Sequence, residues 1–81
     1  MEYHYVVKVK FDDRNADVDR GKTKNYFDFI TRFDAIGIGS DRDGTSHLIF
    51  NSDKRLDAKR ISKELGGIEV LALNVSEMRA A

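Results

Sequence analysis

The chain has 81 residues, no cysteine, no proline, and 14 basic and 14 acidic side chains. This length predicts one domain over residues 1–81, with no room for a separate catalytic lobe. The lack of cysteine excludes disulfides and thiolate zinc sites, and zero net charge argues against long-range steering of nucleic acid. Because no stretch reaches the roughly 20 apolar residues of a membrane span and no signal peptide is visible, we expect a cytoplasmic protein that does not enter membranes.

The N-terminal segment, residues 2–11, alternates between two faces. A period of two with β-branched and aromatic residues predicts a strand with one buried face. The buried face carries Tyr3, Tyr5, Val7, Val9 and Phe11, and the opposite face carries Glu2, His4, Val6, Lys8 and Lys10.

Residues 12–22 mix aspartates with basic residues and have no apolar period, which predicts a loop. From Thr23, a candidate N-cap, apolar residues recur at helical spacing. This stripe predicts a helix that supplies three aromatic rings to the core, through Tyr26, Phe29, Ile30 and Phe33.

The segment that follows Asp34 predicts a hairpin. Residues 35–40 form its first strand, with Ile36 and Ile38 inward and the glycines between them outward. Gly44 can adopt the positive φ of the turn. The second strand, residues 46–51, buries Leu48 and Phe50 and exposes His47 and Ile49.

Residues 52–67 predict a helix that can be phased in two ways. If the helix began at Ser52, Leu56 would lie opposite the rest of the apolar stripe. If Asp57 is the N-cap, Leu56 and Ile61 have the spacing of a hydrophobic staple. We prefer the second phasing, which gives a helix over residues 58–65 that ends at Gly66 and Gly67 in a left-handed turn.

The last strand is predicted over residues 68–75, with residues 78–81 as a frayed tail. The order strand, helix, strand, strand, helix, strand predicts a two-layer α+β sandwich, the ferredoxin-like βαββαβ fold with a four-stranded antiparallel sheet. Its first and third strands are central, and one sheet face is open. If Leu71, Leu73 and Val75 form the buried set, the open face carries His4, Val6, Lys8, Lys10, His47, Ile49, Ile68, Val70 and Ala72.

An open face with this much aliphatic surface usually pairs with another molecule, and a symmetric homodimer is the simplest candidate. His4 and His47 share this face and could approach each other as a metal site or a pH-sensitive contact. They supply two protein ligands, one short of a normal site, which favours hydrogen-bonded or interface histidines.

A basic cluster surrounds the second helix and consists of Lys54, Arg55, Lys59, Arg60 and Lys63. Cations in the first turn of a helix oppose its macrodipole, at about 0.3–1 kcal/mol per exposed charge. Beside the free amides of the helix they can also attract phosphate or a partner's carboxylates. The alternative interpretation is a solvated helix face.

An acidic cluster follows the first strand and consists of Asp12, Asp13, Asp17 and Asp19. Carboxylates are the natural ligands of magnesium or calcium. The pattern fails as a calcium loop, because Val18 replaces the required glycine and Lys24 the required glutamate. Solvated loop carboxylates are the alternative interpretation.

Several short motifs carry a family resemblance: Phe11-Asp12, Thr45–Phe50, and Leu56-Asp57-Ala58 followed by Ile61 and Leu65. Their layout resembles the small ferredoxin-like proteins related to the CRISPR-associated adaptation endonuclease subunit and to virulence-associated protein D. The resemblance implies a dimer and, in some members, cleavage of RNA or DNA by a metal held between two strand-end aspartates. Asp12 matches that position, with Asp13 beside it, and Mg²⁺ would be the cofactor.

Two functions follow as hypotheses. The first is a non-enzymatic binding module, an adaptor or inhibitor of the kind found in bacteria and phages. It would engage an acidic protein or a nucleic-acid-bearing partner through the basic cluster and need no cofactor. The second is a metal-dependent nuclease that uses Asp12. No glycine-rich phosphate loop or paired nucleophile and base is present in the sequence.

Overall fold

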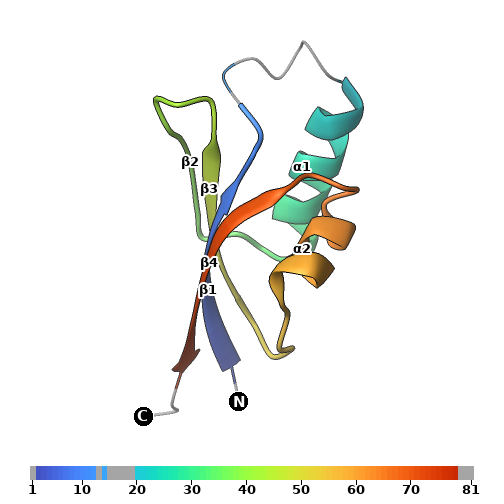
Figure 1. The fold of residues 1–81 in the computed structure, drawn as a ribbon. Coiled ribbons are helices and arrows are strands. Elements are labelled where there is room, and N and C mark those ends of the chain that lie inside the picture. Colours follow the sequence, from blue (N-terminus) through green and yellow to red (C-terminus); the bar gives the residue numbers. More distant parts are fainter. Residues whose placement is uncertain (1, 13, 15–19, 79–81) are drawn as a thin grey trace.

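The structure, a computed structural model, describes residues 2–12, 14 and 20–78. The elements are β1 (Glu2–Val9), α1 (Arg20–Arg32), β2 (Gly37–Ser40), β3 (Ser46–Ser52), α2 (Ala58–Glu64) and β4 (Val70–Met78). The strands pair antiparallel in the order β2-β3-β1-β4, and both helices cover one face of the sheet (Figure 1). The predicted ferredoxin-like α+β fold and the central positions of β1 and β3 are confirmed.

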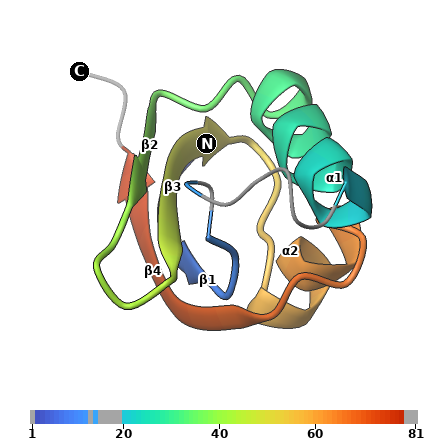
Figure 2. The same cartoon turned by 90° about the horizontal axis from the view of Figure 1, so that it is seen from above.

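The core lies between the two central strands and the two helices. Tyr5 of β1 pairs with Phe50 of β3, and their rings stack with centroids 4.9 Å apart. Phe29 of α1 meets Phe50 edge-on at 5.2 Å. Seen from above, the sheet curves around this core while α1 and α2 close it from the other side (Figure 2). The face of residues 2–11 that was predicted to be buried is therefore the face that packs against the helices.

The first helix begins earlier than predicted. α1 starts at Arg20, so Thr23 lies inside the helix and its prediction as N-cap was wrong. Residues 20–22 are exposed, and a turn that buries nothing has no apolar period to reveal it. The predicted apolar stripe is confirmed, because Tyr26 and Phe29 are buried.

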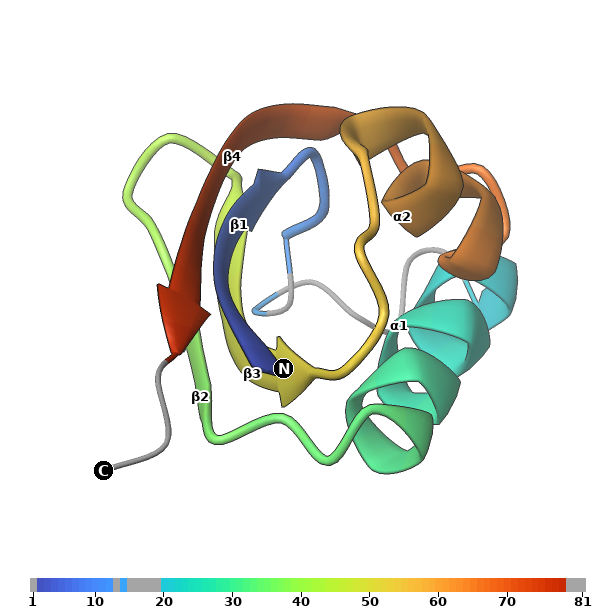
Figure 3. The same ribbon diagram turned by 90° about the horizontal axis from the view of Figure 1, so that it is seen from below.

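The β2–β3 hairpin forms as predicted around Gly44, which has a φ of 79°. Ile38 pairs with Leu48, so it points toward the helix side of the sheet. It is nevertheless 50% exposed, and Ile36 is 63% exposed, so their predicted burial was wrong. The reason is position, because β2 is an edge strand and the helical layer does not cover it (Figure 3).

A β-bulge shifts the phase of β4. Lys8 pairs with Ala72, but the next residue, Val9, pairs with Val70, which leaves Leu71 as the extra residue. Side chains of a strand alternate between faces, so one extra residue moves everything before it to the opposite face. Leu71, predicted to be buried, is 46% exposed.

The bulge overturns part of the predicted open face. Ile68 is buried and Val70 packs against the core, so the prediction that both lie on the open face was wrong. Beyond the bulge the predicted phase is correct, since Leu73 and Val75 pair with core residues of β1. Leu73 packs against the core, but Val75 is 36% exposed, so its predicted burial was wrong. β4 also runs through Met78, so the prediction of a frayed tail was wrong for this residue; residues 79–81 lie outside the described part of the chain.

The second helix follows the predicted phasing. The Asp57 side chain accepts a hydrogen bond from the Arg60 amide at 2.8 Å, which confirms the N-cap. Leu56 and Ile61 are both buried in the core cluster, as a staple requires. α2 ends at Glu64, one residue earlier than predicted, and Gly66 closes its C-terminus at a φ of 71°.

Candidate binding surface

Five exposed cationic side chains lie within residues 54–63, and we call this set the basic surface. The β3–α2 connection contributes Lys54 and Arg55, and α2 contributes Lys59, Arg60 and Lys63, which line one shallow hollow. The first turn of α2 contains no acidic residue. Between residues 53 and 64 the chain carries five basic and three acidic residues, a local excess of positive charge in a chain whose net charge is zero.

A buried tyrosine fixes the backbone of the β3–α2 connection. The Tyr5 hydroxyl donates to the Lys54 carbonyl at 2.6 Å and accepts from the Leu56 amide at 2.7 Å. Tyr5 belongs to β1 and is fully buried. The core therefore sets the position of the segment that carries Lys54 and Arg55.

Two arginines of the basic surface are held by neighbouring side chains. The Arg55 guanidinium lies over the Tyr3 ring, 5.6 Å from its centroid, in a cation–π contact. Arg60 Nε lies 3.0 Å from Glu64 Oε1. Among residues 2–12, 14 and 20–78, we find no ion pair for Lys54, Arg55, Lys59 or Lys63.

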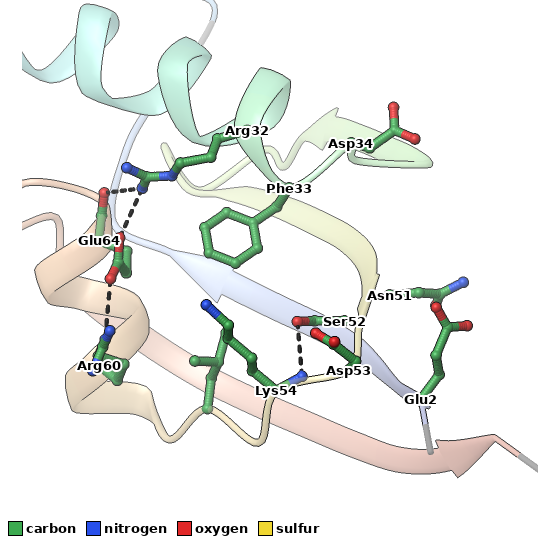
Figure 4. A pocket seen from close by; sticks show the side chains of 11 residues that line it. Glu2, Arg32, Phe33, Asp34, Asn51, Ser52, Asp53, Lys54, Arg60 and Glu64 are labelled. Carbon is green, nitrogen blue, oxygen red and sulfur yellow. Dashed lines mark hydrogen bonds and ion pairs between the residues drawn. The ribbon is translucent and has the colours of Figure 1, made fainter.

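The structure adds Arg32, a residue that sequence reasoning missed. Its Nη2 lies 2.9 Å from Glu64 Oε2, so Glu64 stands between Arg32 and Arg60 (Figure 4). Arg32 ends α1 and is 32 residues from Glu64 in sequence, so only the packing of the two helices brings them together. Its place as a basic residue in the last turn of α1 was the available signal.

A pocket of about 470 Å³ opens beside the basic surface, between the end of α1, the end of β3 and α2. Arg32, Lys54 and Arg60 contribute cations to it. Its other charged lining residues are acidic: Glu2, Asp34, Asp53 and Glu64 (Figure 4). The pocket is therefore not a cationic hollow, and the excess of positive charge lies on the outer side of α2.

The acidic cluster is described only in part. Asp12 Oδ1 accepts hydrogen bonds from the Arg14 amide at 3.0 Å and from Arg14 Nε at 3.2 Å. Asp13, Asp17 and Asp19 lie outside the described residues. Within the described ranges, no group of three or more histidine, aspartate or glutamate side chains could hold a metal ion. Both of these contacts join Asp12 to Arg14, and the second is an ion pair.

The two histidines each have a separate partner. His4 Nδ1 lies 2.8 Å from Asn51 Oδ1, and His47 Nδ1 lies 3.3 Å from Asp41 Oδ1. In the β1–β3 register His4 faces Asn51 while His47 faces Lys8. This separates the histidines by four positions, roughly 13 Å along the strands. The expectation that they approach each other was wrong.

The open sheet face is more polar than predicted. Val6 and Ile49 pair across β1 and β3 on this face, together with the two histidines and Lys8. Val70 is absent from it because of the bulge. The aliphatic surface that motivated a dimer through this face is correspondingly smaller.

The carboxylate of Asp43, in the β2–β3 turn, is held by several donors. The pKa of Asp43 is lowered from 3.8 to about 2. The largest cause is the hydrogen bond from the Thr45 hydroxyl, and the next is the hydrogen bond from Lys8 Nζ at 3.2 Å. A folded-state pKa below the unfolded value stabilises the fold above that unfolded value. The stabilisation is lost as the pH falls from 3.8 through about 2.

Thr45→Val is expected to raise the pKa of Asp43 toward 3.8, because it removes the hydroxyl with the largest effect on this carboxylate. An NMR titration of the Asp43 carboxyl carbon measures the change. Lys8→Met removes both the hydrogen bond and the positive charge of Lys8, and it should also raise the Asp43 pKa. An Asp43 pKa that stays near 2 in Thr45→Val would contradict this account.

Comparisons with protein-family models, with curated proteins and with solved structures gave no match. No activity or partner is therefore carried over from a relative. Neither of the described helices is long and apolar enough to cross a membrane.

Proposed function

We propose that this protein is a small binding module that engages an acidic protein surface through the basic surface. The observation that supports it is the exposure of Lys54, Lys59 and Lys63 without an ion pair among the described residues. Lys59 lies in the first turn of α2, where a cation opposes the macrodipole. A charge that costs stability at its own site is more readily explained by a role in binding.

An acidic protein fits better than nucleic acid for two reasons. The chain has zero net charge, whereas binding to the phosphate backbone relies on many cations. Bases usually stack on aromatic rings exposed on the central strands. Here Tyr5 and Phe50 are buried on the helix side of the sheet.

The arginines and the lysines of the basic surface would contribute to binding in different ways. Arg55 is held by Tyr3 and Arg60 by Glu64, so each loses less side-chain entropy when it meets a carboxylate. The lysines supply long-range attraction that speeds association and weakens with salt. The proposal therefore includes strong dependence of affinity on ionic strength.

The test is fluorescence anisotropy with three labelled probes that carry the same number of negative charges. The probes are a polyglutamate peptide, double-stranded DNA and single-stranded RNA. The test variant is the triple substitution Lys54→Glu, Lys59→Glu and Lys63→Glu, which breaks no described contact of these side chains. It should weaken peptide binding by about tenfold or more.

The control variant reverses three exposed cations elsewhere, Lys10, Arg20 and Arg42, and so changes the net charge equally. It should retain most of the affinity for the peptide. Equal losses in both triple variants would contradict the proposal, as would a wild-type protein that binds none of the probes. If the protein bound DNA or RNA more tightly than the peptide, the partner would be a nucleic acid and the proposal of an acidic protein partner would be wrong.

A further inference from the structure

The outer edge of β4 is the longest unpaired strand edge in the described part of the chain. β4 has nine residues and pairs with β1 on one side only. The other edge strand, β2, has four residues. In Figure 1, the lower half of β4 extends with β1 past the helical layer. Nine residues correspond to about 30 Å of free backbone donors and acceptors.

This edge lacks most of the features that keep sheet edges from pairing. Natural edges are usually short, or carry proline, inward-pointing charges or repeated lysines. From Val70 to Met78 the sequence has no proline and no lysine, although 35% of the whole chain is charged. Its one charged residue, Glu77, is on the core-side face opposite Tyr3, near the end of the strand. Leu71 and Met78 are exposed large apolar residues, and Val75 is 36% exposed. The bulge at Leu71 affects one end of the strand and leaves residues 72–78 in regular register.

The regular part of β4 is complementary to itself. If two copies pair antiparallel about a two-fold axis at Asn74, Leu73 faces Val75 of the second copy, and Val75 faces Leu73. Both residues lie on the core side of the sheet, since they pair with Val7 and Tyr5 of β1. Cross-strand aliphatic pairs of this kind stabilise antiparallel sheets. A shift of the axis to Val75 would set Leu73 opposite Glu77, and a shift to Leu73 would set Val75 opposite the bulged residue Leu71.

We infer that β4 is a homodimerisation edge, through which two copies form one continuous eight-stranded sheet centred on Asn74. The pairing of one such strand buries roughly 1,000 Å² in total, at the low end of specific interfaces. A dimer of this size is in exchange with monomer, so its population rises with protein concentration.

The geometry has a consequence for the basic surface. The two-fold axis is perpendicular to the sheet, so both helical layers lie on the same side of it. α2 adjoins the start of β4, where Lys59 and Val70 line one shallow pocket. The dimer would thus present two basic surfaces on one side, and a partner with two acidic patches would gain avidity. The dimer itself does not depend on the proposed binding function.

The test is sedimentation velocity of the wild-type protein without ligand, from micromolar to millimolar concentration, together with variants that report the register. Ala72 and Ser76 are exposed, and the inferred pairing sets each opposite the other in the second copy. Ala72→Glu with Ser76→Glu sets like charges opposite each other twice, and should weaken dimerisation by about tenfold. Ala72→Glu with Ser76→Lys sets opposite charges at the same positions and should restore it.

Val75→Lys, an inward-pointing charge at the edge, should give a monomer at all concentrations. Circular dichroism of each variant separates a lost dimer from a lost fold. A wild-type protein that stays monomeric up to millimolar concentration overturns the inference. The edge of β4 would then be available to pair with a strand of another protein. A dimer that responds equally to the Glu/Glu and Glu/Lys variants also overturns it, because its interface then lies elsewhere.

Discussion

Lys59→Glu is expected to make the protein more stable and, at the same time, a weaker binder of acidic peptide. Position 59 lies in the first turn of α2, so an acidic side chain there gains about 0.3–1 kcal/mol from the helix macrodipole. It also replaces the repulsion between Lys59 and Lys63 by an i,i+4 attraction of about 0.2–0.5 kcal/mol. Loss of binding in a more stable protein cannot be attributed to unfolding.

Lys63→Glu is the matched control for this experiment. It makes the same change of charge four residues further along, in the last turn of α2. There the acidic side chain meets the negative end of the macrodipole, so the gain in stability is smaller than at Lys59 or is reversed. Both variants should weaken binding to polyglutamate by a few-fold, since each removes one cation of the basic surface.

Urea denaturation gives the two free energies of unfolding, and anisotropy gives the two affinities. The expected pattern is a higher free energy of unfolding for Lys59→Glu than for Lys63→Glu, with a similar loss of affinity in both variants. If Lys59→Glu lowered the stability, the placement of this lysine at the positive end of α2 would be wrong. If it left the affinity unchanged, Lys59 would have no part in binding.

Tyr5→Phe is expected to lower the free energy of unfolding by about 1–3 kcal/mol, the cost of buried polar groups that lose their partner. The Tyr5 hydroxyl is bonded to both the Lys54 carbonyl and the Leu56 amide, and Leu56 is buried. Phenylalanine fills the same space in the core, so loss of packing contributes little. The variant therefore isolates the attachment of the β3–α2 connection to β1.

The same substitution should loosen the segment that carries Lys54 and Arg55, and so weaken peptide binding beyond any change in the folded fraction. Tyr3→Phe is the control: Tyr3 stands two residues earlier on the same face, and its ring contact with Arg55 does not need the hydroxyl. Its cost should be well below that of Tyr5→Phe. Equal effects of the two substitutions would show that the hydroxyl of Tyr5 does not hold this connection.

Amide hydrogen exchange provides an independent measurement for Tyr5→Phe. The Leu56 amide donates to the Tyr5 hydroxyl, so its protection should fall most in the variant. Protection at the Ile61 amide, which donates within the backbone to Asp57, should change less. A uniform loss of protection would indicate global destabilisation without local release.

Local chemistry in the sequence was sufficient to predict the fold and part of the candidate surface. Asp57 fixes the start of α2, because an aspartate before the apolar stripe caps the amide three residues on. Gly44 marks the hairpin because it can adopt a positive φ. The period of two in β1 shows which face is buried. The cations of the basic surface follow from the same phasing, since they lie within one short segment.

The remaining features depend on contacts between residues far apart in the chain, which no local pattern contains. The bulge at Leu71 arises from how β4 pairs with β1, and it decides that Ile68 and Val70 face the core. Arg32 meets Glu64 only when α1 packs beside α2. Tyr5 and Leu56 are 51 residues apart, so their hydrogen bond exists only in the folded sheet. Sequence alone therefore determined which segments form elements, while tertiary pairing decided the faces of β4 and the position of the basic surface.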